Sequence, residues 1–144
     1  MPRVYVVYGS EASVLSTFWS DIASDAFRIY NSTKPSKNEG CCDVSLDLFE
    51  ENFDAYLKTN HVTEIIFIGA AFQNQKELFI REDKNSIASQ VSTNITNYLK
   101  LVHYLLPKMV ERRYGRFIYL SSFRSNTTSR GMSIYSSSKA FGEK

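Results

Sequence analysis

The most informative pair of residues in this 144-residue sequence is Tyr135 and Lys139, which stand four positions apart near its end. In a helix this spacing puts both side chains on one face. A tyrosine donates or accepts a proton near neutral pH only if its pKa of about 10 is lowered, and a nearby ammonium group lowers it by stabilising the phenolate. The pair therefore predicts proton transfer at Tyr135. The same spacing recurs at Tyr30–Lys34 and Tyr104–Lys108, which we interpret as chance matches.

Two further residues support a site at Tyr135. Ser122 follows the apolar run Arg116–Leu120, so its hydroxyl is expected at the end of a strand, thirteen residues before Tyr135. Neither of the other tyrosine–lysine pairs has a strand-end serine at that distance. Asn94 lies inside a long helical segment, where asparagine has mediocre helix propensity. A packing or hydrogen-bonding role for Asn94 is one interpretation, and a solvated side chain is the other.

A possible nucleotide-binding turn follows the first apolar run. Dinucleotide-binding turns carry several glycines, because backbone amides at a helix N-terminus must approach the pyrophosphate without a side chain between them. Here only Gly9 is a glycine, and Ser13 and Leu15 stand where further glycines would be expected. The segment from Gly9 through Ser10 to Val14 thus indicates either a phosphate site or an ordinary strand-to-helix turn.

Short apolar runs alternate with longer segments of helical period, which predicts a parallel sheet covered by helices on both faces. Strands are expected at Val4–Tyr8, Phe27–Tyr30, Cys41–Val44, Ile65–Ile68 and Arg116–Leu120. Helices are expected after Gly9, over Leu46–Asn60, along a stripe of Val91, Ile95, Leu99, Val102 and Leu106 that Pro107 should end or kink, and from Ser133 onwards. The sequence therefore predicts an α/β fold with a Rossmann-like doubly wound parallel sheet in three layers, α/β/α. Ligands of such a fold bind beyond the carboxyl ends of the strands.

Composition and charge narrow the class of protein. Hydrophobic residues make up 43% and charged residues 22%, so disorder, collagen-like repeats and coiled coils are poor fits. Residues 1–144 have the size of a single domain. The net charge of +2, without a basic block, disfavours nucleic acid as a partner.

The sequence carries little that would mark export, a membrane or a metal. Val4–Tyr8, the longest apolar run near the start, is too short for a signal peptide or a membrane span, so a cytoplasmic protein without a membrane partner is expected. Cys41 and Cys42 are adjacent, which disfavours a disulfide between them and fits plain thiols. His61 and His103 lie far apart without a metal-binding spacing, so no metal site is predicted.

Taken together, these features resemble the short-chain dehydrogenase/reductase family, in its shorter single-domain branch, over nearly the whole chain. Asn94–Asn97 and Leu106–Met109 resemble the family's N-L-T-G helix and its L-P-x-M ending. Gly115–Ser122 resembles its G-R-I-V-N-I-S-S strand, and Tyr135–Lys139 follows at the family's spacing. Cys42–Val44 resembles the x-D-V after the third strand, where the family's aspartate contacts the adenine.

The resemblance implies an NAD(P)-dependent oxidoreductase that reduces a carbonyl or oxidises an alcohol of a small molecule. Tyr135 would donate the proton to the carbonyl, Ser122 would polarise that carbonyl, and Lys139 would lower the tyrosine pKa and bind the nicotinamide ribose. Asn94 would hold the water that links Lys139 to solvent, and the cofactor would supply the hydride. Cofactor contacts are implied at Gly9, Ser10, Ser13, Val14, Asp43, Val44, Gly69, Ala70, Tyr135 and Lys139.

Three features depart from the family pattern. The turn keeps only Gly9, so a non-catalytic dinucleotide-binding scaffold or sensor on the same fold is one alternative. Ile68–Ala71 replaces the family's N-N-A-G, and Ser138–Glu143 echoes the S-K-x-x-G-E of the extended branch, so a sugar-nucleotide-modifying enzyme is another. Family members also continue into further strands and helices, so the chain is expected to be C-terminally incomplete. An exposed sheet edge would then favour a homo-oligomer.

The end of the second strand bears on the choice of cofactor. An acid there would bind the ribose hydroxyls of NAD, and a base would favour the phosphate of NADP. Asn31 and Ser32 are neither, whereas Lys34 and Lys37 follow in the loop. The sequence leans to NADP, with solvated loop lysines as the alternative.

Overall fold

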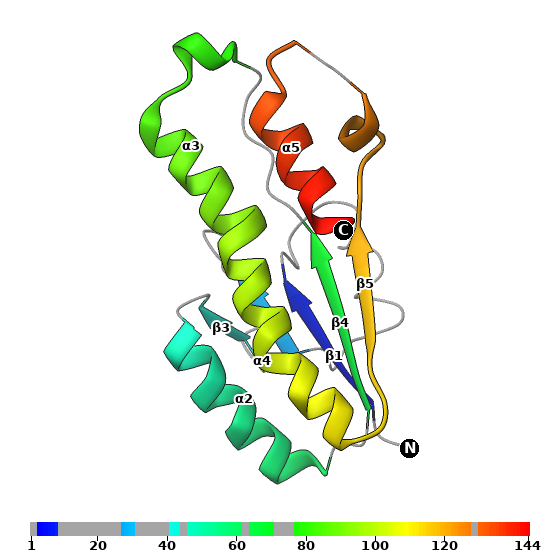
Figure 1. Ribbon diagram of the computed structural model, residues 1–144. Coiled ribbons are helices and arrows are strands. Elements are labelled where there is room, and N and C mark those ends of the chain that lie inside the picture. Colours follow the sequence, from blue (N-terminus) through cyan, green and yellow to red (C-terminus); the bar gives the residue numbers. More distant parts are fainter. Residues whose placement is uncertain are drawn as a thin grey trace.

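The structure is a computed structural model that describes residues 3–8, 27–30, 41–43, 46–61, 64–70, 77–127 and 130–144 (Figure 1). The five predicted strands are confirmed, and so are the helices predicted over Leu46–Asn60, along the long stripe and after Ser133. The helix predicted after Gly9 lies outside the described residues.

Five parallel strands form one sheet in the order β3-β2-β1-β4-β5. Their bounds are Arg3–Tyr8 for β1, Phe27–Tyr30 for β2, Cys41–Asp43 for β3, Glu64–Ala70 for β4 and Arg116–Leu120 for β5. Because β1 pairs with both β2 and β4, Val6 lies opposite Phe27 on one side and Phe67 on the other. The strand order therefore reverses at β1, and the carboxyl ends of β1 and β4 mark the place where folds of this type bind ligands. The predicted doubly wound parallel sheet is confirmed.

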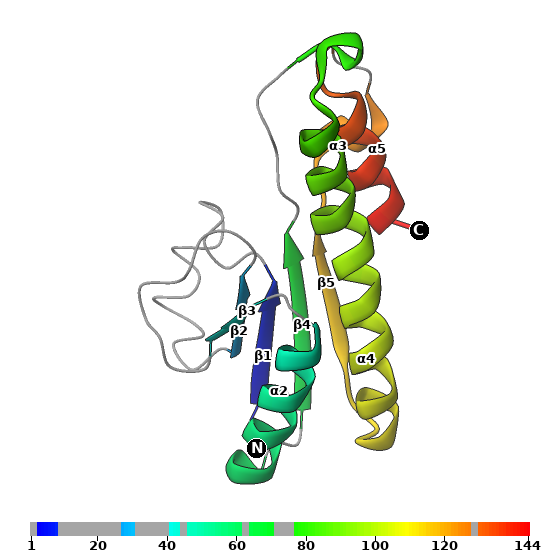
Figure 2. The ribbon, with the colours of Figure 1, turned by 90° about the vertical axis from the view of Figure 1, so that its left-hand side faces the viewer.

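The described helices lie together in one layer against the sheet, as Figure 2 shows. They are α2 Leu46–Asn60, α3 Lys84–Val91, the π-helical segment η2 Ser92–Thr96, α4 Asn97–Glu111 and α5 Ser133–Gly142, with the short 3₁₀ turns η1 Phe79–Arg81 and η3 Phe123–Asn126. Asp83 starts α3, because its carboxylate accepts the backbone N–H groups of Asn85 and Ser86. From there α3, η2 and α4 run on as one rod, with α5 packed against α3 and η2, and α2 against α4.

Aromatic rings hold the helix layer on the sheet. Phe27 of β2 lies 5.3 Å from Phe53 of α2, measured between ring centroids. Phe49 of α2 lies 5.4 Å from Tyr104 of α4, in an edge-to-face arrangement. The valine and isoleucine side chains Val4 and Ile65 beneath them are fully buried. This cluster joins β2, α2 and α4 and fixes the height of the long helix above the strands.

The apolar stripe predicted for the long helix is wrong by one position over most of its length, although Val102 of that stripe does pack against the core. α4 buries Leu101, Leu105 and Met109, whereas Leu99 and Leu106 of the predicted stripe are each 48% exposed. The buried residues of the first half are polar, namely Gln90, Thr93 and Asn94. A stripe that is drawn through the apolar residues alone therefore lies next to the face of the helix that is buried. Nor does Pro107 end the helix, which continues through it to Glu111.

The tyrosine and lysine of the pair Tyr104–Lys108 tie α4 to α2. The Tyr104 hydroxyl donates to Asp54 Oδ1 at 2.5 Å, and Lys108 Nζ donates to the same oxygen at 2.8 Å. Burial raises the pKa of Asp54, but the hydrogen bonds from Lys108 and Tyr104 outweigh it and hold that pKa below its ordinary value. The spacing that elsewhere suggests catalysis therefore forms a contact between two helices here.

We expect the Asp54→Asn variant to be less stable at neutral pH by less than about 1 kcal/mol, because the Asp54 side chain is 47% exposed and solvent screens the ion pair. A lowered folded-state pKa means that the carboxylate stabilises the fold above its unfolded-state pKa of about 3.9 and loses this effect as the pH falls through the folded-state value. Urea unfolding should thus separate variant from parent at neutral pH and not in strong acid. A difference that stayed the same in acid would contradict this role.

α4 ends in a tight turn that leads directly into β5. Arg113 adopts a left-handed conformation with φ of 55°, and its N–H donates to the carbonyl of Val110 at 3.1 Å. The N–H of Tyr114 donates to the carbonyl of Met109, also at 3.1 Å, which completes a Schellman motif. A Cβ on Gly115 would overlap the Met109 side chain, so glycine lets the chain pass close to the helix end.

Candidate active site

Lys139 is buried on α5 and reaches the end of β5. It is 3% exposed, and its Nζ donates a hydrogen bond to the carbonyl of Leu120, the last residue of β5. The same Nζ lies 5.0 Å from the centroid of the Tyr119 ring, within range of a cation–π contact. Burial lowers the pKa of Lys139 to about 8, and Glu143 opposes this effect. The amine is therefore charged at neutral pH but close to the point at which it releases a proton.

The ring of Tyr119 packs beneath this lysine. Its hydroxyl donates to the carbonyl of Lys139 at 3.3 Å, and its ring lies 5.3 Å from that of Tyr98. Burial raises the pKa of Tyr119 to about 12, so the hydroxyl stays protonated and remains a donor. A Cβ on Gly142 would overlap the Tyr119 ring, so the glycine allows α5 to approach β5 closely.

Asn94 is hydrogen-bonded and not solvated. It is 2% exposed within η2, and its Nδ2 donates to Ser138 Oγ at 2.9 Å. The Ser138 hydroxyl in turn donates to the carbonyl of Tyr135 at 2.9 Å. Asn94, Ser138 and Tyr135 thus form one chain of contacts that links the long helix to α5. Ser138 was not identified from the sequence as a site residue, because an ordinary serine in a hydroxyl-rich helix gives no signal of a partner 44 residues away.

Ser122 lies at the point where β5 gives way to η3. Its Oγ accepts the backbone N–H of Arg124 at 3.3 Å, and its carbonyl accepts the hydroxyl of Ser125 at 2.8 Å. α5 packs against η3, so Ser122 and Tyr135 belong to neighbouring elements. Their hydroxyls do not hydrogen-bond to each other in the described part of the chain. The structure thus links Asn94 through Ser138 to the helix that carries Tyr135 and Lys139, and it places Ser122 on the neighbouring element.

Glu143 fastens the end of α5 to the loop after β5. Its Oε1 accepts the hydroxyl of Ser125 at 2.5 Å and also that of Ser121. Hydrogen bonds from Ser121 and Ser125 hold the pKa of this carboxyl below its ordinary value. The strand-end hydroxyls are therefore bound to the helix that carries Lys139.

Tyr8 is a second residue of this region that was not identified from the sequence as a site residue. It ends β1, immediately before the candidate turn at Gly9, and is 2% exposed. Its hydroxyl donates to the carbonyl of Thr93 in η2 at 2.6 Å. In the sequence Tyr8 closes an apolar run and was counted only as the end of a buried strand.

The predicted cofactor contacts fall into two groups. Asp43, Gly69 and Ala70 end their strands at the carboxyl edge of the sheet, where Gly69 pairs with both Tyr8 and Tyr119. These positions agree with the ligand side that the strand order defines. The turn residues Gly9, Ser10, Ser13 and Val14, together with Val44, lie outside the described residues.

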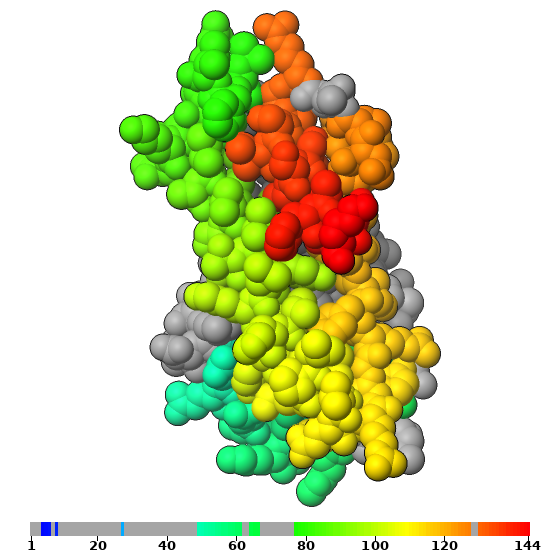
Figure 3. Space-filling view, viewed as in Figure 1, coloured from blue at the N-terminus to red at the C-terminus, as the bar shows by residue number. Residues whose placement is uncertain are grey.

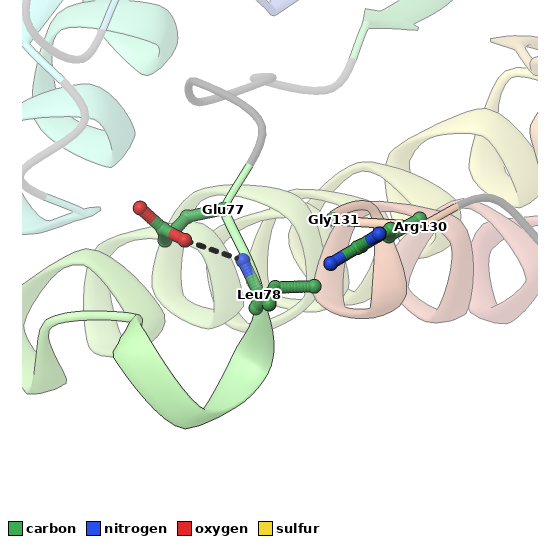
Figure 4. A pocket seen from close by; sticks show the side chains of 4 residues that line it. All are labelled: Glu77, Leu78, Arg130 and Gly131. Carbon is green, nitrogen blue, oxygen red and sulfur yellow. Dashed lines mark hydrogen bonds between the residues drawn. The ribbon is translucent and has the colours of Figure 1, made fainter.

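An open pocket of about 240 Å³ lies between the segment after β4 and the turn before α5 (Figure 4). It is lined by Glu77, Leu78, Arg130 and Gly131. Glu77 Oε1 accepts the backbone N–H of Leu78 at 2.8 Å, which occupies one acceptor at the rim. None of the residues predicted for the site lines this pocket.

Over the described ranges no group of three or more His, Cys, Asp and Glu could hold a metal ion. No helix within those ranges is both long and apolar enough to cross a membrane.

Comparison with known proteins places the chain in a family. Residues 44–144, more than half of the chain, match the family model of the short chain dehydrogenases. The chain therefore belongs to the short-chain dehydrogenase family. No curated protein sequence matches it closely enough to count as a relative.

Solved structures of similar fold agree with this assignment. A short-chain dehydrogenase from Streptomyces avermitilis superposes with a TM-score of 0.77 at 17% identity, over 99% of this chain and 58% of that one. Serine dehydrogenase from Escherichia coli gives 0.78 at 18% identity, over 96% and 70% of the two chains. ElxO, solved with NADP bound, gives 0.74 at 14% identity, over 97% and 63%. The chain thus spans between 58% and 70% of the length of these structures, and the likeness concerns the fold.

Proposed function

We propose that the protein is an NAD(P)-dependent oxidoreductase that interconverts a carbonyl and an alcohol on a small molecule, with Tyr135 as the proton donor. One observation carries this proposal: α5 holds Tyr135 and the buried Lys139 on the helix that also contacts Asn94, at the carboxyl end of β5. Family membership supports an oxidoreductase, and the hydrogen bonds of Asn94 and Ser138 support a fixed position of the helix that carries the tyrosine and the lysine.

The residues at the carboxyl edge fit a dinucleotide. The strand order reverses at β1, and the ends of β1, β4 and β5 lie side by side there. Asp43, Gly69 and Ala70 would contact the cofactor at this edge, with the turn from Gly9 to Val14 at the pyrophosphate. When bound, the cofactor supplies the hydride.

The side chains supply the proton. Tyr135 transfers its hydroxyl proton to the carbonyl oxygen as that oxygen gains negative charge. The ammonium of Lys139 lowers the free energy of the resulting phenolate. For this role the amine would turn from the Leu120 carbonyl toward the ribose and the tyrosine. Ser122 polarises the carbonyl through its hydroxyl, and Asn94 holds the water that returns a proton to Lys139.

Titration of the complete protein with NADPH and with NADH, followed by nucleotide fluorescence, tests cofactor binding without any substrate. We expect saturable binding with a preference for NADPH, because Lys34 and Lys37 follow the second strand. ElxO, which was solved with NADP, supports that preference. Lys34→Ala with Lys37→Ala should weaken NADPH binding by about a hundredfold and leave NADH binding unchanged, since each of the two lost charge-assisted contacts costs roughly 1.5 kcal/mol.

The matched control for this titration is Lys100→Ala, an exposed lysine of α4, which should change neither affinity. Saturable binding without turnover on any ketone or aldehyde would favour the second candidate, a non-catalytic dinucleotide-binding scaffold, which the glycine-poor turn at Gly9 supports. Conversion of a nucleotide sugar alone would favour an enzyme of the extended branch. Failure to bind either nucleotide would contradict both the oxidoreductase and the scaffold.

We further propose that copies of the chain self-associate. Leu99, Leu106 and Val110 of α4 are 48%, 48% and 70% exposed, and α4 lies on the face seen in Figure 3. β5 is an edge strand of the described sheet, and Ile118 on it is also exposed. Exposed apolar side chains in such number are typical of an interaction surface.

A further inference from the structure

The helix that carries Asn94 contains one wide turn. In η2 the N–H of Asn97 donates to the carbonyl of Ser92, five residues back, where an α-helix would direct it to Thr93. Thr93 and Asn94 are nonetheless almost fully buried. Single π-helical turns are rare and occur mostly at functional sites, so the contacts that hold this one bear directly on the candidate active site.

Tyr8 contacts the turn from the sheet. Its hydroxyl donates to the carbonyl of Thr93, the carbonyl that would accept the Asn97 N–H in a regular α-helix. Burial raises the pKa of Tyr8 to about 12, while hydrogen bonds to Asn97 and Thr93 oppose this. The phenol therefore stays protonated and lies against both ends of the turn. It is joined to Thr93 across 85 positions of sequence, so only the folded sheet brings it there.

Ser138 contacts the turn from α5. Its hydroxyl is 1% exposed, accepts from Asn94 Nδ2 and donates to the carbonyl of Tyr135, with both distances at 2.9 Å. The Ser138 hydroxyl thus acts both as an acceptor and as a donor. Because Ser138 directly precedes Lys139, it links Asn94 to the part of α5 that bears the tyrosine and the lysine.

We propose that Tyr8 and Ser138 are positioning residues, a two-sided clamp that holds the π-helical turn and fixes Asn94 against α5. Neither residue is assigned a contact with the reacting atoms, since both act through Asn94. This inference rests on the proposed function for its catalytic part. Its structural part, that the two hydroxyls hold the turn, is independent of any reaction.

The test compares Tyr8→Phe and Ser138→Ala in the complete protein with two matched controls. Tyr104→Phe removes the hydroxyl of another tyrosine, one on the long helix that bonds to Asp54. Ser137→Ala removes the hydroxyl of the exposed serine next to Ser138. We expect each clamp variant to lower kcat on a ketone substrate about ten- to a hundredfold, with KM for substrate and for NADPH within about twofold. The controls should leave kcat unchanged.

Hydrogen exchange adds a readout that needs no turnover. Backbone amides of residues 93–98 should exchange about tenfold faster in Tyr8→Phe than in the parent, because one buried hydrogen bond is lost. Tyr104→Phe should not alter exchange there. The double variant of Tyr8 and Ser138 should lose less kcat than the product of the single effects, because both residues act through one turn.

Unchanged exchange at the turn would overturn the clamp, and faster exchange with an unchanged kcat would overturn its catalytic part. If the unmodified protein reduces no carbonyl compound at all, the proposed function fails and the catalytic part of this inference fails with it. Exchange at residues 93–98 still supports or overturns the structural part in that event.

Discussion

Replacing Tyr135 by phenylalanine should lower turnover by at least about a hundredfold and leave NADPH affinity unchanged, because the ring remains and only the transferable proton is lost. Steady-state rates on a panel of ketones and aldehydes, combined with the nucleotide titration, give the two quantities. Unchanged turnover would exclude Tyr135 as the proton donor.

Tyr104→Phe is the matched control for this prediction, because Tyr104–Lys108 repeats the spacing of Tyr135–Lys139 on another helix. Its hydroxyl bonds to Asp54 on the side of α2, away from the carboxyl ends of the strands. It should lower stability slightly and leave the rate unchanged. Equal losses of rate in both variants would mean that general destabilisation, and not proton transfer, explains the effect.

Leu105→Ala should lower the free energy of unfolding by about 2–5 kcal/mol, because the side chain is fully buried beneath α4 and its loss leaves a cavity. Leu106→Ala changes the same residue type at the adjacent position, which is 48% exposed. It should cost less than about 1 kcal/mol in the monomer. Urea unfolding of the two variants thus tests the orientation of the helix.

The same two variants also test self-association. If copies of the parent protein bind each other, the urea midpoint of the parent should rise with protein concentration. The urea midpoint of Leu106→Ala should fall below that of the parent only by this concentration-dependent amount. Sedimentation should then show a lower mass for Leu106→Ala. A parent that sediments as a monomer at every concentration would contradict self-association, and larger destabilisation by Leu106→Ala than by Leu105→Ala would contradict the helix orientation.

The strands could be predicted from sequence because each is a short run rich in apolar residues. β1 and β4 bury such residues at Val4 and Ile65, whereas the edge strand β5 exposes Ile118. The phase of the long helix could not be predicted in the same way. It carries apolar residues on two faces, and the face that meets α5 and Tyr8 is polar at Thr93 and Asn94. Hydrophobicity therefore favoured the wrong side of the helix.

Some residues of the candidate site could likewise be predicted from the sequence, and others could not. Tyr135 and Lys139 were found because a fixed spacing on one helix is visible in a sequence. Tyr8 and Ser138 were not, because their importance lies in partners 85 and 44 positions away that only the fold defines. The roles of the turn residues from Gly9 to Val14 stay predictions.

The turn at Arg113 has a consequence for the engineering of this protein. A residue with a Cβ in the left-handed conformation costs roughly 1 kcal/mol relative to glycine, and Arg113 holds that conformation at φ of 55°. The turn joins the long helix to β5, the strand that leads to Ser122 and the Lys139 contact. Replacing Arg113 by glycine should therefore raise the thermal stability at a turn remote from Tyr135. Resistance to heat and catalytic chemistry can then be selected separately.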